Sequence, residues 1–262
     1  MITLKPIGFQ DNTPLMTWRD VFVIRDNRYL LKNICFDLFK DDFIAIIGPN
    51  GAGKSTLLRT AAGLMRADGY AAILQRQASG LSGKERARLI SYLPQQRKFV
   101  WPMTARAVVS LGVSKKAENA DENALDVDNC LRSLGITHLA DNPIDKLSGG
   151  ERARIFLARA LVSSAPILIA DEPLNSLDPS AQLRAIEVLA NRAASGRPVI
   201  AAFHEISLAL SHATKILIVR DGYMLAYAPP RIIVESDALS RAYGVKFNCY
   251  STPHGYDVTF SS

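Results

Sequence analysis

A glycine-rich segment, GPNGAGKST at residues 48–56, constrains the fold of this chain more than any other feature. It follows the continuous apolar run FIAII at residues 43–47 and precedes apolar residues at helical spacing from Leu57 to Met65. An apolar run without alternation is typical of a strand buried on both faces of a parallel sheet. The order of strand, glycine-rich loop and helix therefore predicts an α/β fold with a phosphate-binding loop.

The loop fits the pattern G-x-x-x-x-G-K-S. Its glycines let successive backbone N–H groups turn toward phosphate oxygens, and the N-terminus of the following helix adds its positive dipole end. Lys54 can reach the β- and γ-phosphates, and the Ser55 hydroxyl can bind Mg²⁺. We expect the nucleotide to contact Gly48, Pro49, Asn50, Gly51, Ala52, Gly53, Lys54, Ser55 and Thr56.

A second motif, ILIADE at residues 167–172, places two acids after an apolar strand. Asp171 at the strand end can hold a water on a Mg²⁺ ion, and Glu172 can polarise an attacking water. Acids at strand ends often do no more than begin helices, so the pair alone indicates little. Beside a phosphate loop, it supplies the two acids that phosphoryl transfer needs.

A third motif, LSGGERARIFLARAL at residues 147–161, opens with the capping box formed by Ser148 and Glu151. The simplest interpretation is a well-capped amphipathic helix. However, Gly149 and Gly150 inside the box cost helix stability and leave N–H groups open to an anion. The sequence thus predicts a second phosphate-binding helix terminus in one chain.

The remaining pattern indicates short strands before residue 48, with a turn at Asp26 and Asn27, and a hairpin over residues 215–227 with an Asp-Gly turn. The apolar runs at 166–170 and 199–203 predict further parallel strands. Helical patterns dominate residues 97–146, which we interpret as a helical insertion. We find no internal repeat.

Composition narrows the class of protein. Of 262 residues, 48% are hydrophobic and 21% charged, which excludes a disordered chain. No apolar run approaches the ~18 residues of a membrane span, and we identify no signal peptide at the N-terminus. The net charge of +6 decides nothing by itself. Cys35, Cys130 and Cys249 have no metal-site spacing, and their roles stay open; we expect buried, unreactive thiols.

Together these motifs resemble the ATP-binding subunit of ABC transporters. Residues 48–55 are similar to the Walker A loop, and Asp171 and Glu172 to the Walker B aspartate and catalytic glutamate. LSGGE at residues 147–151 matches the family's signature motif. Three further matches are Gln95 in YLPQQ to the Q-loop, Asp178 in NSLDP to the D-loop, and His204 in FHE to the switch histidine.

The resemblance implies one ABC ATPase domain over residues 1–262. Its mixed sheet would carry an N-terminal antiparallel β subdomain and a helical subdomain at about residues 97–165. Two chains would form a head-to-tail dimer that holds two ATP molecules, each clamped by one Walker A loop and the partner's signature loop. It further implies catalytic roles for Glu172, His204 and Gln95, nucleotide contacts from Ser148, Gly149, Gly150 and Asp178, and Mg²⁺ binding by Ser55, Gln95 and Asp171.

One departure concerns the base of the nucleotide. Most family members have an aromatic residue upstream of Walker A that stacks on adenine, but Arg25 occupies the aligned position. A guanidinium plane can also lie on a purine face. Tyr29 nearby is an alternative, and the preference between ATP and GTP stays open.

LSGKERARLISYLPQQ (81–96), WPMTARAVVSLG (101–112) and ALSRAYGVKF (238–247) resemble the importers of iron-siderophores, haem and cobalamin. The implied protein is a peripheral ATPase on the cytoplasmic face of the inner membrane, bound to permease subunits and indirectly to a substrate-binding protein, with no nucleic acid. Phe99, Val100 and Trp101 would contact the permease, or else pack the helical core. Alternatives are an importer of metal ions or molybdate, or an iron–sulfur assembly ATPase. The cargo stays undetermined.

Overall fold

The computed structural model describes residues 13–96, 102–113 and 120–261. Phe99, Val100 and Trp101 lie outside these ranges. The strands of the main sheet are β1 (Met16–Arg25), β2 (Arg28–Leu38), β3 (Phe43–Ile47), β4 (Asp68–Ile73), β5 (Arg76–Gln77), β6 (Ile90–Leu93), β7 (Ile167–Ala170), β8 (Val199–Ala202), β9 (Lys215–Arg220) and β10 (Tyr223–Ala228). Two further strands, β11 (Lys246–Thr252) and β12 (Gly255–Ser261), form a separate antiparallel hairpin.

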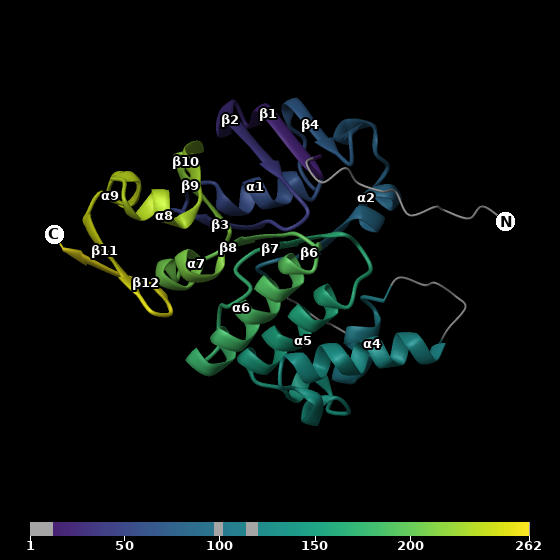
Figure 1. Ribbon diagram of the computed structural model, residues 1–262. Coiled ribbons are helices and arrows are strands. Elements are labelled where there is room, and N and C mark those ends of the chain that lie inside the picture. The colour runs from purple at the N-terminus through teal and green to yellow at the C-terminus, as the bar shows by residue number, and fades with distance from the viewer. Residues whose placement is uncertain (1–12, 97–101, 114–119, 262) are drawn as a thin grey trace.

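The described helices are α1 (Lys54–Ala61), α2 (Gly83–Leu89), α3 (Ala105–Ser110), α4 (Ala120–Ser133), α5 (Gly149–Leu161), α6 (Pro179–Ala194), α7 (Ile206–His212), α8 (Pro230–Val234) and α9 (Ala238–Tyr243). In Figure 1, α4, α5 and α6 lie on one side of the central strands, and α1 with β1, β2 and β4 lies on the other. None of the helices in the described part of the chain is both long and apolar enough to cross a bilayer.

The sheet is mixed, as the sequence predicts. Its order is β5-β4-β1-β2-β10-β9-β3-β8-β7-β6. Strands β9, β3, β8, β7 and β6 run parallel to one another, whereas β1, β2, β4 and β5 pair antiparallel. The expected α/β fold with an N-terminal antiparallel β portion is therefore confirmed.

The apolar run of β3 is explained by two hydrophobic cores, one on each face of the sheet. Phe43, Ala45 and Ile47 point into the core that contains α5, α6 and α7. Ile44 and Ile46 point into the core that contains α1 and the antiparallel strands. Because successive residues of a strand alternate between faces, a strand covered on both sides must be apolar throughout.

The helical region lies between β6 and β7. Helices α3 and α4 both pack against α5, and their buried side chains join the core on that face of the sheet. Helix α4 begins at Ala120, within residues 97–146 where the sequence indicates a helical insertion. The proposed limits of a helical subdomain, 97–165, stay a prediction.

Two expected turns are present. Asp26 and Asn27 have φ of 49° and 56° between the paired residues Arg25 and Arg28, and Asp221 and Gly222 have φ of 51° and 80° before β10. Two consecutive positive φ angles are characteristic of the type I′ hairpin turn.

Helix α1 ends earlier than its apolar pattern predicts. Gly63 has φ of 72°, and the Leu64 N–H donates to the Arg59 carbonyl. A glycine in the left-handed conformation, followed by an N–H that bonds the carbonyl five residues earlier, forms a Schellman motif, which ends the helix. Met65 of the predicted helix therefore lies outside it.

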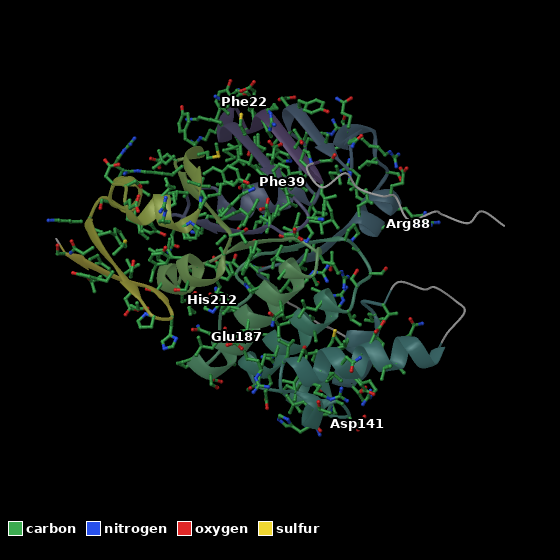
Figure 2. All side chains as sticks on the ribbon, in the orientation of Figure 1. Phe22, Phe39, Arg88, Asp141, Glu187 and His212 are labelled. Atoms are coloured by element: carbon green, nitrogen blue, oxygen red, sulfur yellow. The ribbon has the colours of Figure 1, made fainter. Side chains whose placement is uncertain are left out.

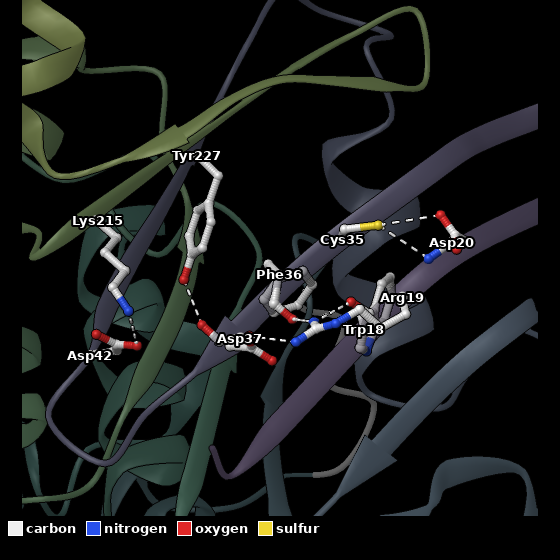
Figure 3. A network of polar contacts seen from close by, with 9 residues as sticks. All are labelled: Trp18, Arg19, Asp20, Cys35, Phe36, Asp37, Asp42, Lys215 and Tyr227. Carbon is white, nitrogen blue, oxygen red and sulfur yellow. Dashed lines mark hydrogen bonds and ion pairs between the residues drawn. The ribbon is translucent and has the colours of Figure 1, made fainter. Parts of the chain in front are cut away.

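A polar network ties the antiparallel strands to the rest of the sheet (Figure 3). The β2–β10 pairing consists of one residue pair, Tyr223 and Lys32. Further along, the Tyr227 hydroxyl donates to the Asp37 carbonyl at 2.5 Å, and Lys215 pairs with Asp42 at 2.8 Å. The Tyr227–Asp37 bond thus adds a second link between β10 and β2, and the Lys215–Asp42 pair joins β9 to the turn that follows β2.

The polar side chains of Arg88, Asp141 and Glu187 are exposed, and Figure 2 shows Arg88 and Asp141 toward the edge of the molecule. The three cysteines are free. Contrary to the expectation of full burial, each is only half-buried.

Candidate functional site

The carboxyl ends of four adjacent parallel strands meet at one edge of the sheet. The neighbours β3, β8, β7 and β6 end at Ile47, Ala202, Ala170 and Leu93. Each is followed within two residues by a predicted site residue: Gly48, His204, Asp171 and Gln95. This edge is the usual ligand site of open α/β sheets. The parallel register thus brings together motifs that lie up to 156 positions apart in the sequence.

The phosphate loop is held in a conformation that requires glycine at its first position. Gly48 has φ of 152°, and a Cβ there would lie 2.0 Å from the Val219 carbonyl oxygen. Gly53, with φ of 110°, is the N-cap of α1 and provides no side-chain cap. The first N–H groups of α1 are therefore available to a phosphate.

The Lys54 side chain is buried against the loop itself. Its Nζ donates to the Gly48 carbonyl at 2.6 Å and to the Pro49 carbonyl at 3.1 Å. Burial lowers the pKa of the Lys54 ammonium, while Glu172 and Asp171 oppose that shift. The ammonium is thus held in the loop that would surround the phosphates.

Asp171 and Ser55 form a pair of oxygen ligands. The Ser55 hydroxyl donates to Asp171 Oδ1 at 3.0 Å. Asp171 is fully buried, and burial raises the pKa of its carboxyl although Ser55 and nearby cations oppose the shift. Within the described residues, its Oδ2 is buried without a hydrogen-bond partner. A buried, unpartnered carboxylate oxygen beside a hydroxyl suits a hard divalent cation.

Three side chains of the site form hydrogen bonds with the Glu172 carboxylate. Its Oε1 lies 2.7 Å from His204 Nε2, and its Oε2 accepts from Gln95 Nε2 at 2.8 Å. Asn175 Nδ2 also donates to Oε2. The residue has φ of 52°, a strained conformation for a side chain with a Cβ. The structure thus brings together the three predicted catalytic residues and adds Asn175.

Asn175 was missed by the sequence reasoning. It lies in NSLDP, the segment from which only Asp178 was selected. Asp178 itself caps α6. Its Oδ1 accepts from the Ser180 hydroxyl at 2.6 Å and from the Ala181 N–H at 3.0 Å. These two hydrogen bonds lower the pKa of the Asp178 carboxyl. Its expected nucleotide contact stays a prediction.

The signature loop begins α5 with the predicted capping box. Ser148 Oγ accepts from the Glu151 N–H at 3.3 Å, and Glu151 Oε2 accepts from the Ser148 N–H at 2.8 Å. Among the hydrogen bonds of the described residues, none joins residues 148–150 to the phosphate loop. Within the described part of one chain, the N-terminus of α5 and the phosphate loop before α1 are therefore separate anion-binding sites.

One short similarity, too brief to form a repeated structural unit, lies at the starts of α2 and α5. LSGKERAR at residues 81–88 and LSGGERAR at residues 147–154 differ only at Lys84 and Gly150, and both begin helices with a capping box. The structure explains the difference, since a Cβ at Gly150 would lie 2.7 Å from the Ser176 carbonyl oxygen. Only the second copy packs against the segment that follows Glu172.

Arg25 lies at the β1–β2 turn with an exposed side chain, its Nε 3.6 Å from Asp26. Tyr29 pairs with Ile24, and its ring contacts Phe22. The pairing of β1 with β2 is irregular on both sides of Val23, and the base contacts of Arg25 and Tyr29 both stay predictions.

Comparison with known proteins agrees with this site. A family model described as "ABC transporter" matches residues 31–175. The hemin import ATP-binding protein HmuV of Nocardia farcinica is 34% identical over 219 residues, which are 82% of this chain and 76% of that protein. The ferric enterobactin transport ATP-binding protein FepC of Escherichia coli is 34% identical over 224 residues, 82% of each chain.

Solved structures show the same fold. The ATP-binding cassette MJ0796, in a dimeric post-hydrolysis state bound to ADP and Pi, superposes with a TM-score of 0.75 at 26% identity, covering 82% of this chain and 99% of that one. A chain of an ABC transporter in an inward-facing conformation gives a TM-score of 0.77 at 22% identity, covering 95% and 97%.

Proposed function

Because this chain belongs to the ABC transporter family and is an ATPase subunit, we propose that it powers import of a metal chelate or cobalamin through a membrane permease. The chelate would be an iron-siderophore or haem. Relatives named for hemin, ferric enterobactin and cobalamin import support this cargo class. The observation that carries the mechanism is the Glu172 carboxylate, which Gln95, Asn175 and His204 surround at the end of β7.

The phosphate loop binds the nucleotide. Backbone N–H groups of residues 50–56, which include the N-terminus of α1, surround the phosphates, and Lys54 turns from its two loop carbonyls to the β- and γ-oxygens. Arg25 lies against the base by stacking its guanidinium plane.

The oxygens of Ser55 and Asp171 fit a Mg²⁺ ion, since Asp171 Oδ2 is buried and unpartnered while the Ser55 hydroxyl lies beside Oδ1. Gln95 completes the set. When bound, the ion neutralises charge on the β- and γ-phosphates.

Glu172 orients and polarises the attacking water. One of its oxygens is directed by His204 and the other by the Gln95 and Asn175 amides, so the carboxylate cannot rotate freely. His204 is also placed to contact the γ-phosphate, since it follows the strand next to β3. General-base assistance of this type contributes about 10²–10⁴ in rate.

The subunit acts as a homodimer. Residues 148–150 and Asp178 of one copy complete the ATP site of the other, which accounts for an anion-binding helix terminus that has no bond to its own phosphate loop. The dimer binds polytopic permease subunits at the cytoplasmic face of the inner membrane, and a substrate-binding protein indirectly.

The proposal is tested by uptake. Cells that lack this chain should lose accumulation of a labelled iron-siderophore, haem or cobalamin, and the intact chain should restore it whereas Glu172→Gln should not. An affinity-tagged chain should also copurify with a polytopic membrane protein. Unchanged uptake of all three cargo classes in the deletion strain would contradict the proposed import function.

A further inference from the structure

The C-terminal hairpin depends on its neighbours for stability. Strands β11 and β12 pair with each other and, within the described residues, with no strand of the main sheet. An isolated two-stranded hairpin is at best marginally stable in water. Its Cys249 and Val258 are opposite each other and pack with Phe247 and Tyr256 onto the core around α7. Figure 1 shows β12 beside α7.

Two serines of α7 hold the outer edge of β12. The Val258 N–H donates to Ser207 Oγ at 3.2 Å, and the Tyr256 N–H donates to Ser211 Oγ at 2.9 Å. Ser207 and Ser211 are one helical turn apart, whereas Tyr256 and Val258 are two residues apart on one strand edge. The two spacings match, so these bonds satisfy strand N–H groups that would otherwise be unpaired.

The contact is too close for an ordinary side chain. Gly255 has φ of 133°, and a Cβ there would lie 2.3 Å from Ser211 Oγ and 2.4 Å from Ser211 Cβ. A glycine is therefore needed where β12 begins, and the hairpin is fitted closely to α7.

Helix α7 is joined directly to the catalytic edge. It begins at Ile206, two residues after His204, whose Nε2 lies 2.7 Å from Glu172 Oε1. A helix of only seven residues has few internal hydrogen bonds, so its position depends on packing. Whatever fixes α7 also fixes the backbone that carries His204.

The same C-terminal segment reaches the phosphate loop. The Gly48 N–H donates to the Tyr243 hydroxyl at 3.0 Å, while the Gly48 carbonyl accepts from Lys54. The Tyr243 ring, at the end of α9, contacts Phe247 of β11 with centroids 5.3 Å apart. Burial raises the pKa of the Tyr243 hydroxyl, and the bond from the Gly48 N–H opposes that shift.

We propose that residues 238–261 are a positioning element of the ATPase site, with Ser207 and Ser211 transmitting the position of the hairpin to His204 and Tyr243 fixing the start of the phosphate loop. This inference rests on the proposed role of His204 in turnover. The two contacts act on different steps, because His204 serves hydrolysis while the loop serves nucleotide binding.

The hairpin contact is tested with the full-length protein carrying Ser207→Ala and Ser211→Ala together. We expect kcat for ATP to fall about fivefold and the nucleotide Kd to change less than about twofold, within the range that lost hydrogen bonds explain. Ser207→Thr alone, which keeps an acceptor, should retain the wild-type kcat. Ser251→Ala, an exposed serine of the same hairpin, is the matched control and should behave as wild type.

The loop contact is tested with Tyr243→Phe, which removes one oxygen and leaves the Gly48 N–H unpaired. The nucleotide Kd should rise about two- to tenfold while kcat at saturating ATP stays within about twofold. Tyr250→Phe removes the same oxygen from a tyrosine that is 55% exposed, and should change neither. Thermal unfolding of each variant shows whether the fold is intact.

Wild-type kcat in the folded serine variant, or wild-type Kd in Tyr243→Phe, would overturn the inference. So would equal losses of kcat and affinity that follow a drop in melting temperature, because these indicate general destabilisation. The variant His204→Ala separates a failure of the proposed role of His204 from a failure of the positioning role of the hairpin. If it keeps full turnover, the proposed role of His204 fails; if it is inactive while the serine variant is normal, only the positioning role fails.

Discussion

Replacing Glu172 by glutamine should stop hydrolysis and leave the site assembled. The carboxylate accepts from Gln95 and Asn175 at Oε2 and faces His204 at Oε1. A glutamine at this position can keep its carbonyl oxygen toward the two amides. Its NH₂ group then faces His204 Nε2, which accepts that bond when the imidazole proton is on Nδ1.

The magnitudes follow from that exchange. The hydrogen bonds are retained in number, so the free energy of unfolding should change by less than about 1 kcal/mol. The base is lost, so turnover should fall about 10²- to 10⁴-fold, which corresponds to ~3–5 kcal/mol in activation free energy. ATP binding should persist, because none of the phosphate-loop groups is altered, and the ATP-bound dimer should accumulate.

The assay is steady-state phosphate release by the purified variant, with nucleotide binding and light scattering on the same sample. Glu187→Gln on α6 makes the same chemical change at an exposed position and serves as the matched control. Wild-type hydrolysis by Glu172→Gln would refute the reasoning. A large loss of melting temperature would instead refute the argument that the amide fits.

Four other predictions can be measured directly. Arg25→Ala should weaken nucleotide binding several-fold without changing its Mg²⁺ dependence, and Arg25→Tyr should restore it; unchanged binding of a fluorescent ATP analogue would remove Arg25 from the site. Specific activity should rise with protein concentration until dimers form, because we propose that residues 148–150 complete the partner's site, and a fully active monomer by light scattering would contradict this. Trp101→Ala should uncouple transport while ATPase activity persists, whereas loss of folding would favour a core position. Burial raises the pKa of Cys130 to about 11, so its alkylation should be slow at pH 8 and accelerate as the pH rises through that value; fast labelling at pH 8 would contradict the burial.

The sequence was sufficient for the parts of the fold that depend on local chemistry. FIAII predicted β3 because a strand covered on both faces has no polar position, and the Asp-Gly pair predicted the β9–β10 turn because both residues adopt positive φ. The end of α1 was missed because it depends on Gly63, which the apolar pattern ignores.

The site was predicted less completely for a physical reason. Motifs such as the phosphate loop act through contiguous backbone, so a short segment identifies them. Tyr243 acts through a side chain that only the fold brings to Gly48, 195 positions away. Asn175 is three residues after Glu172, and its contact depends on the turn that the loop makes there. The sequence therefore offers no signal for Tyr243, whereas the short distance from Glu172 to Asn175 could have indicated the second contact.

Within one chain, a short series of contacts connects the signature loop to the proposed catalytic glutamate, Glu172. Gly150 of the signature loop lies so close to Ser176 that a Cβ would come within 2.7 Å of its carbonyl oxygen, and the neighbouring Asn175 donates to Glu172. In the proposed head-to-tail dimer, that signature loop would contact the ATP held by the other copy. A shift of the loop on binding or release of that ATP would press on Ser176 and move Asn175 relative to the carboxylate. Each copy would therefore sense the nucleotide of its partner through three consecutive contacts, and a side chain at position 150 should weaken this coupling as well as the packing.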